Sequence, residues 1–178
     1  KSITKTTSLL RKQLNDIHDL VNQIEKKNTQ SSKNISSWLL TTEQVLQELN
    51  LPESSKFSVK RATLSAFIPS TRTKKKELLQ LCANTLTTAQ SDLWETYTQY
   101  SDPLENATRL IDQLLAVIYQ TKQFKYDTTE DFTLFLDQVW NFCCQHEQLK
   151  GISTQILSLV NKSDVIIIMA EKIALENL

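Results

Sequence analysis

The sequence predicts an all-α protein, an elongated bundle of long antiparallel helices. Apolar side chains recur in alternating steps of three and four residues over two long stretches, which is the period of a helix seam. Only one glycine and three prolines occur in 178 residues, so the turn residues that hairpins and phosphate-binding loops require are scarce. Because 40% of the residues are apolar, the chain can fill a core. We expect one helical-bundle unit over residues 1–178, as a piece of a longer protein.

The first seam extends over residues 3–49. Its positions are Ile3, Thr7, Leu10, Leu14, Ile17, Val21, Ile24, Asn28, Ser31, Ile35, Trp38, Thr42, Val45 and Leu49. The simplest interpretation is one helix of about 47 residues, roughly 70 Å long at about 1.5 Å per residue. The alternative is a break near residues 28–34, where Thr, Gln, Ser and Asn lower the helix propensity.

Residues 51–73 differ in composition from the rest of the chain. Pro52 and Pro69 bracket them, and they are rich in serine, threonine and basic residues. We expect a connector inside the bundle, with one or two helical turns near residues 59–67. Its apolar residues should dock on the bundle while its cations stay in solvent.

A second seam passes through the chain's third proline, Pro103. Its positions are Leu79, Cys82, Leu86, Ala89, Leu93, Thr96, Tyr100, Leu104, Ala107, Ile111, Leu114 and Ile118. Because the phase is preserved across Pro103, one kinked helix over residues 73–122 is one interpretation. Two helices that meet at Ser101 are the other, because Ser-Asp-Pro is typical of a helix start.

The last third of the chain predicts three shorter helices. The first should have its cap at Asp127 or Thr128 and continue to about residue 150, with Gly151 at its end. One of its faces carries Phe132, Phe135, Leu136, Val139, Trp140, Cys143 and His146. Residues 152–161 and a strongly apolar helix to Leu178 complete the chain.

Charge suggests one candidate partner-binding surface. The chain carries 20 basic and 20 acidic residues, so nothing in its net charge favours nucleic acid or an anionic membrane as the main partner. The basic residues gather in a stretch without acids, and they are Lys56, Lys60, Arg61, Arg72, Lys74, Lys75 and Lys76. They could bind an anionic surface, of membrane phosphoinositides or of nucleic acid, whereas the ordinary role of such a run is a solvated face.

Two other groups of residues have a chemical and a structural interpretation. Cys143 and His146 share a helix face and could supply two zinc ligands or a nucleophile and its base, but no second ligand pair accompanies them. We therefore expect buried thiols, no metal, no cofactor and no catalysis. An odd number of cysteines suits a reducing compartment, the cytoplasm or nucleus.

Core anchors are predicted at Trp38, Trp94 and Trp140, with an exposed interface residue as the alternative for a tryptophan.

Three short phrases are similar to signatures of spectrin repeats. Residues 38–46, Trp-Leu-Leu-Thr-Thr-Glu-Gln-Val-Leu, resemble the first helix of a repeat. Trp94 in Leu-Trp-Glu-Thr-Tyr resembles the tryptophan of the third helix, and residues 146–149, His-Glu-Gln-Leu, resemble a second-helix phrase. The resemblance implies three-helix bundles joined end to end by shared helices, as in cytoskeletal and nuclear-envelope scaffolds. Residues 51–73 depart from it, because a long second helix should lie there.

The sequence therefore predicts a non-enzymatic scaffold or tether for protein–protein interaction in a cytoskeletal, nuclear-envelope or chromosome-associated assembly. Its partners would be other proteins that dock a helix or peptide on the bundle, and a second copy of the chain is a further candidate. The alternative is an adaptor that binds an anionic surface through residues 56–76. Membranes and nucleic acids are less favoured partners, because the net charge is zero and the longest strongly apolar run is far shorter than a bilayer-spanning helix.

Overall fold

The structure is a computed structural model that describes residues 2–68 and 74–178, and within these ranges the protein is all-α. Its contacts divide the chain into two compact units. The N-terminal unit is Thr6–Gln99, and the C-terminal unit is Lys1–Lys5 together with Tyr100–Leu178. This division differs from the single bundle that the sequence predicted, because the second seam contributes buried side chains to two separate cores.

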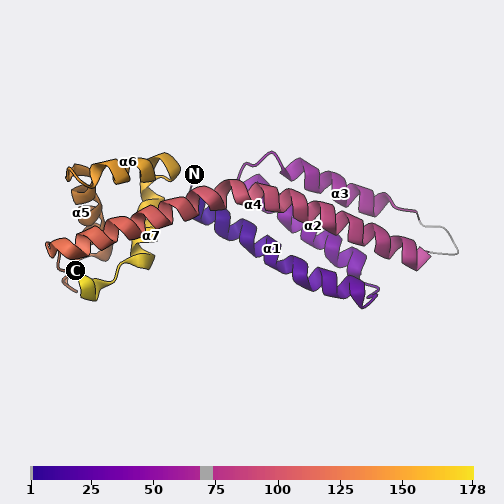
Figure 1. Cartoon of the computed structure of the whole chain (residues 1–178). Coiled ribbons are helices and arrows are strands. Elements are labelled where there is room, and N and C mark those ends of the chain that lie inside the picture. Colours follow the sequence, from indigo (N-terminus) through magenta and orange to yellow (C-terminus); the bar gives the residue numbers. More distant parts are fainter. Residues whose placement is uncertain (1, 69–73) are drawn as a thin grey trace. The chain divides into compact units, whose positions relative to one another are not determined.

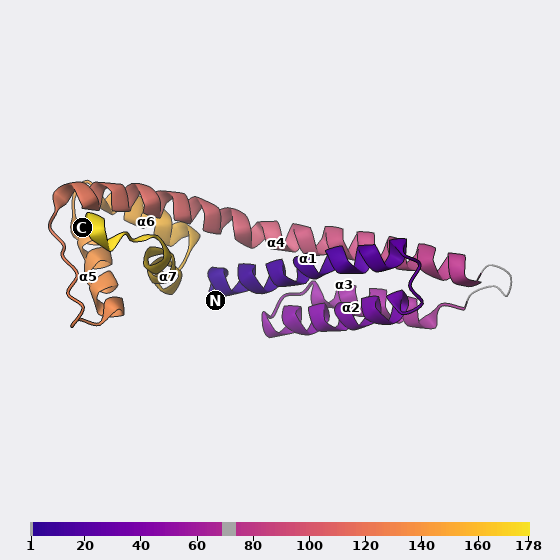
Figure 2. The ribbon, with the colours of Figure 1, turned by 90° about the horizontal axis from the view of Figure 1, so that it is seen from below.

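The described residues of the N-terminal unit form four helical segments. They are α1 (Ile3–Glu25), α2 (Ser31–Glu48), α3 (Ser54–Ala66) and the first half of α4 (Lys74–Thr121). The segments lie side by side in both views (Figures 1 and 2). All four contribute buried side chains to this unit, among them Leu10, Leu39, Phe57 and Leu93.

The predicted single helix over residues 3–49 is wrong, because the chain reverses between α1 and α2. Lys27 adopts a left-handed conformation with φ 53°. The side-chain oxygen of Asn28 accepts a hydrogen bond from the N–H of Gln30 at 2.9 Å, and the hydroxyl of Ser31 donates to the Asn28 carbonyl at 2.8 Å. The polar residues that interrupt the seam therefore form the turn, close to the break at 28–34 that was the alternative.

Residues 51–73 contain a complete helix, α3, rather than a connector with one or two turns. Phe57 and Leu64, seven residues apart, are its two buried residues, so one face of α3 points into the core. The ring of Phe57 meets the indole of Trp38 edge to face, with centroids 6.2 Å apart. Because α3 has only these two buried side chains, its sequence shows little of the apolar periodicity that predicts a helix.

The second seam forms one helix. α4 is continuous over 48 residues and contains Pro103, so the interpretation with two helices meeting at Ser101 is wrong. Proline removes one N–H donor from the helical ladder. The neighbouring apolar residues, Ala107 and Ile111, are fully buried in the C-terminal unit, and this packing holds the helix through the defect.

The C-terminal unit packs three further helices against the second half of α4. They are α5 (Phe132–Gln145), α6 (Lys150–Leu159) and α7 (Lys162–Lys172), followed by a short 3-10 turn at Leu175–Asn177. Trp140 lies in their core and is 2% exposed. Gly151 lies in the first turn of α6 and does not end α5, and the helix predicted to reach Leu178 ends at Lys172.

The cap of α5 is Asp131, not Asp127 or Thr128. Its carboxylate accepts hydrogen bonds from the N–H groups of Thr133 at 2.8 Å and Leu134 at 3.1 Å. We expect Asp131→Ala to lower the free energy of unfolding by about 1 kcal/mol, as loss of a helix cap does. Denaturant titration followed by circular dichroism measures this. Asp127→Ala, four residues earlier in the preceding turn, should have the smaller effect, and the reverse order would contradict the assignment.

Candidate functional site

A groove lies between α1 and α4 in the N-terminal unit. Two cavities, of about 580 Å³ and 240 Å³, share the residues Ile24, Glu25 and Ala83 and are therefore continuous. We call the combined feature the α1–α4 groove. Its lining residues are Val21, Ile24, Glu25, Lys27, Lys75, Lys76, Leu79, Gln80, Ala83, Leu86, Thr87 and Gln90.

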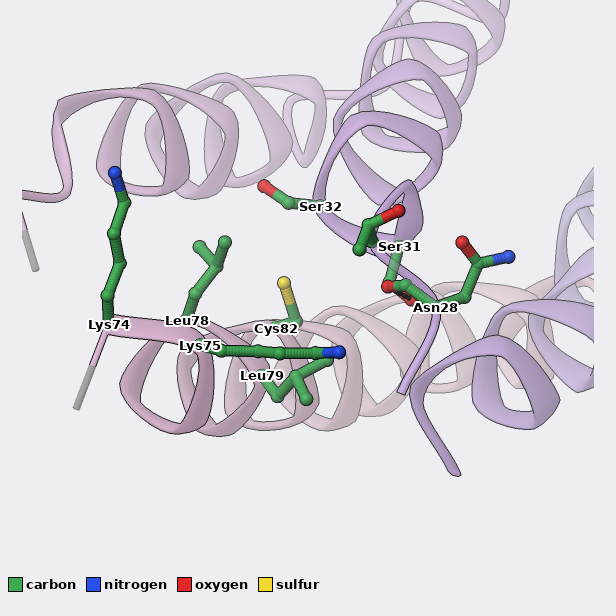
Figure 3. Close-up of a pocket in the computed structure, with 9 residues that line it drawn as sticks. Asn28, Ser31, Ser32, Lys74, Lys75, Leu78, Leu79 and Cys82 are labelled. Atoms are coloured by element: carbon green, nitrogen blue, oxygen red, sulfur yellow. Dashed lines mark hydrogen bonds between the residues drawn. The ribbon is translucent and has the colours of Figure 1, made fainter. Parts of the chain in front are cut away.

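A third cavity, of about 290 Å³, adjoins one end of this groove and shares Lys75 and Leu79 with it. Figure 3 shows Leu78 and Cys82 of α4 pointing toward the first turn of α2, with the sulfur of Cys82 directed at Ser32. Burial raises the pKa of the Cys82 thiol, and the hydrogen bond with Ser32 opposes this only in part. The base of the cavity is therefore apolar and unreactive.

Cations surround this end of the groove. Lys74, Lys75 and Lys76 form the first turn of α4, and Lys27 lies in the turn after α1. Glu25 is the one acid among the residues that line the three cavities. Positive charge at a helix N-terminus is unfavourable toward the helix dipole, but Lys75 and Lys76 also face the C-terminal end of α1, where the dipole favours cations.

The predicted basic surface is divided between two environments. Lys56 and Lys60 of α3 both form ion pairs with Asp92 of α4, the former at 3.4 Å. Arg61 pairs with Glu43 of α2 at 3.1 Å. These three cations therefore contact acids of their own unit.

The pKa of Asp92 reflects the double pairing. Burial alone would raise it, but hydrogen bonds and charge from Lys60, and then from Lys56, outweigh the burial and hold the pKa below its ordinary value. The other predicted cations lie elsewhere. Lys74, Lys75 and Lys76 line the cavities at the start of α4, and Arg72 lies outside the described residues.

The three tryptophans differ in environment. Trp38 is 6% exposed and its indole N–H donates to the carbonyl of Gln13 at 3.0 Å, and Trp140 is buried in the other unit. Trp94 is 57% exposed, so its prediction as a core anchor is wrong. The physical reason is its position beside Leu93, which occupies the seam and is fully buried. The offset of one residue from the seam was the signal in the sequence.

Trp94 is the exposed aromatic residue of a cluster that joins α1 to α4, in which Tyr97 is buried and Arg11 is exposed. Its ring lies 5.5 Å from that of Tyr97, centroid to centroid. Arg11 of α1 donates two hydrogen bonds to the hydroxyl of Tyr97, from Nη2 at 2.8 Å and from Nε at 3.1 Å. The guanidinium carbon also lies 5.8 Å from the Tyr97 ring centroid, within cation–π range. We call these three residues the Trp94 cluster.

The thiols of the C-terminal unit lack the features of a nucleophile. Cys143 is fully buried, and burial, with a smaller contribution from Cys144, raises its pKa to about 12. Burial also raises the pKa of Cys144. The His146 ring stacks on Phe142, with centroids 5.1 Å apart. In the ranges 2–68 and 74–178, no three or more His, Cys, Asp or Glu side chains gather where a metal ion could bind.

Alkylation should separate these thiols by rate. At pH 8 a thiol with a pKa of about 12 is about one part in ten thousand thiolate, the reactive form. We expect iodoacetamide to modify the half-buried Cys144 well before Cys143 and Cys82, both of which are fully buried. Mass spectrometry of timed samples measures the order, and unfolded protein, in which all three thiols react, is the control. Modification of Cys143 as fast as Cys144 would contradict the buried position.

Among the described helices none is by itself long and apolar enough to cross a membrane, and only the bent pair α6 and α7, at 111°, reaches that length and composition together. Comparisons with protein families, with curated proteins and with solved structures find no match for this chain.

Proposed function

We propose that this protein is a non-enzymatic helical scaffold or tether that binds other proteins, and the Trp94 cluster carries the proposal. Tryptophan, tyrosine and arginine are the residue types that dominate binding energy at protein interfaces. In the N-terminal unit Trp94 is 57% exposed, and the buried Tyr97, itself held by hydrogen bonds from Arg11, contacts its ring and orders it before any partner binds. A preorganised cluster loses little side-chain entropy on binding.

The proposed protein works in the kind of assembly that the sequence predicts, a cytoskeletal, nuclear-envelope or chromosome-associated one. The proposed compartment is the cytoplasm or nucleus, because three free cysteines are compatible with a reducing environment. The proposed arrangement is an elongated, spectrin-like one, in which successive units share a helix. α4, which contributes residues to both units, supports it. Small-angle X-ray scattering tests it, and a particle no longer than one unit would contradict it.

The proposed function is tested by removing the Trp94 indole and measuring which partner proteins no longer bind. Tagged wild-type chain, Trp94→Ala and the control Val59→Ala are used to capture proteins from cells, with quantitative mass spectrometry as the readout. Val59 is also exposed, at 66%, but lies on α3, a helix that contributes no residue to the cluster. We expect a defined set of proteins to be lost with Trp94→Ala and retained with Val59→Ala. Retention of the whole set with both variants would contradict the proposal.

The second candidate function is an adaptor for an anionic surface. The three consecutive lysines at the start of α4 favour it, because they line open cavities. Binding of phosphoinositide vesicles or of nucleic acid through these lysines should weaken steeply with salt and should not change with Trp94→Ala, whereas a protein contact made by the Trp94 cluster should be lost with Trp94→Ala. Titration of each ligand at low and high ionic strength, with the wild-type chain and with Trp94→Ala, distinguishes the two functions.

A further inference from the structure

We propose that the α1–α4 groove binds an acidic amphipathic helix of a partner protein, with the Trp94 cluster at one end of the contact. This inference rests on the proposed function, because it names the class of partner for the same face of the molecule. Three independent features of the groove support it: an apolar base, a positively charged end and a length that suits a helix.

The base of the groove is apolar. Ile24 of α1 and Leu79 and Leu86 of α4 line it, and Ala83 lies in both cavities at its centre. Alanine at position 83 leaves the space that a larger side chain would fill. Val21 at the side of the groove is 39% exposed, which is unusual for an aliphatic residue of a packed seam. Leucine-like side chains of a partner helix would cover this surface.

The charge of the groove is complementary to carboxylates. Lys27, Lys75 and Lys76 lie at the end that contains the start of α4, and Glu25 is the only acid that lines the groove. At the other end, Arg11 of the Trp94 cluster supplies a further cation. A partner helix with glutamates beside its apolar stripe would place opposite charges against the cations at both ends of the contact.

The length of the surface matches a helix of ordinary size. From Lys76 to Trp94 α4 extends over about 18 residues, or roughly 27 Å at about 1.5 Å per residue. Gln90, the last lining residue of the groove, lies one helical turn before Trp94 on the same face of α4. A partner helix of about five turns would therefore contact the lysines and the indole together.

The same features favour a helix over a phosphate group. A phosphate site needs donors that converge on one point, as at a glycine-rich loop or a paired arginine fork. Here Lys27, Lys75 and Lys76 lie at one end of the groove and Arg11 lies at the other, and a phosphate would leave the apolar base between them uncovered. A helix satisfies both the apolar base and the separated charges.

A designed peptide tests the inference on the full chain. The probe is a fluorescein-labelled peptide of 18 residues with leucines at helical i, i+3, i+4 and i+7 spacing and glutamates on both flanks. Its two controls are a peptide with lysine in place of every glutamate and a scrambled peptide of the same composition. We expect fluorescence anisotropy to show binding of the acidic helical peptide alone. Equal binding of the scrambled peptide would overturn the inference, because general charge attraction would explain it.

Variants of the chain locate the contact. Lys75→Glu with Lys76→Glu should weaken binding by roughly tenfold, as reversal of charges at an interface edge does. Ala83→Phe should block the centre of the groove, and a thermal melt confirms that this variant is folded. The control is Lys122→Glu with Lys125→Glu, which makes the same change of net charge in the C-terminal unit. Unchanged binding by the Lys75 and Lys76 variant would overturn the inference even if Ala83→Phe fails to fold.

Other occupants of the groove give different results. If phosphatidylserine vesicles bind through Lys75 and Lys76 and the peptide does not, an anionic surface is the ligand and the inference is overturned. If the chain alone self-associates in sedimentation and Ala83→Phe abolishes this, a second copy occupies the groove. Partner loss with Trp94→Ala together with failure of the peptide would leave the proposed function standing and reject the acidic helix, so the two failures are distinguishable.

Discussion

Replacement of Asp164 by alanine is expected to lower the free energy of unfolding of the C-terminal unit by roughly 2 to 4 kcal/mol, because a fully buried acceptor of several hydrogen bonds is lost. The carboxylate of Asp164 accepts from the hydroxyl of Ser2 at 2.6 Å and from the N–H groups of Ile3 at 3.0 Å and Thr4 at 3.1 Å. It also accepts from the hydroxyl of Thr4. A residue of α7 therefore caps the first turn of α1, whose N–H donors would otherwise be left without partners.

The same contacts make this stability depend on pH. Burial alone would raise the pKa of Asp164, but the hydroxyls of Ser2 and Thr4 and the N–H groups of Ile3 and Thr4 outweigh it, and the pKa lies below the ordinary 3.8. A depressed folded-state pKa means that the contribution is complete above the unfolded-state value. It is lost as pH falls through 3.8 toward the lower folded-state pKa. Denaturant titrations between neutral pH and pH 3 should therefore show the difference between wild type and Asp164→Ala shrinking as pH falls.

Two further variants control the Asp164 result. Asp164→Asn keeps one acceptor oxygen but no charge, so it should lose less stability than alanine and lack the pH-dependent part. Asp112→Ala removes an aspartate from a solvent-exposed pair with Lys172, at 3.5 Å, and should cost less than about 1 kcal/mol. An equal cost for Asp112→Ala and Asp164→Ala would contradict the capping role.

Trp140→Ala should be the most damaging single change in the C-terminal core, with a loss of about 3 to 5 kcal/mol. The indole is 2% exposed and lies among Ile111, Leu136 and Val139, which are themselves almost completely buried. Its removal leaves a cavity that rigid helices cannot close. Thermal and denaturant unfolding, followed by circular dichroism, measures the loss.

Trp94 provides the matched control for Trp140. It has the same side chain, but it is 57% exposed, so Trp94→Ala should change the free energy of unfolding by less than about 1 kcal/mol. Trp140→Phe should keep most of the packing and fall between wild type and alanine. If Trp94→Ala were as destabilising as Trp140→Ala, the indole of Trp94 would be part of the core and the proposed interaction surface would be wrong.

Local pattern was sufficient for the fold class and for much of the core. The alternating three and four residue steps predicted helices, and seam residues such as Ile17, Leu86, Ile111 and Leu114 are buried. The scarcity of glycine and proline argued against sheets, because the tight turns between strands require these residues and they can be counted in the sequence. Composition and period act over one or two helical turns, and helix formation is decided largely on that scale.

Chain reversals and the surface features depended on contacts between distant residues. A polar seam position such as Asn28 can either stay in a helix or form a turn, and the packing of α2 against α1 decides between them. The contacts that hold α3 in the bundle join distant residues. The ring of Phe57 packs against Trp38, and cations of α3 pair with acids of α2 and α4. The sequence shows a run of basic residues, but the acids that pair with Lys56, Lys60 and Arg61 lie 18 to 36 residues away in the chain.

The sequence alone therefore established that this protein is helical and roughly which side chains are buried, because buried side chains recur with the period of a single helix. Only the folded structure decided that Trp94 is exposed, that a groove opens between α1 and α4, and that Asp164 caps a helix that begins about 160 residues earlier. These outcomes depend on the rotation and register of one helix against another. Each is the sum of many weak contacts across the chain, and no local spacing encodes it.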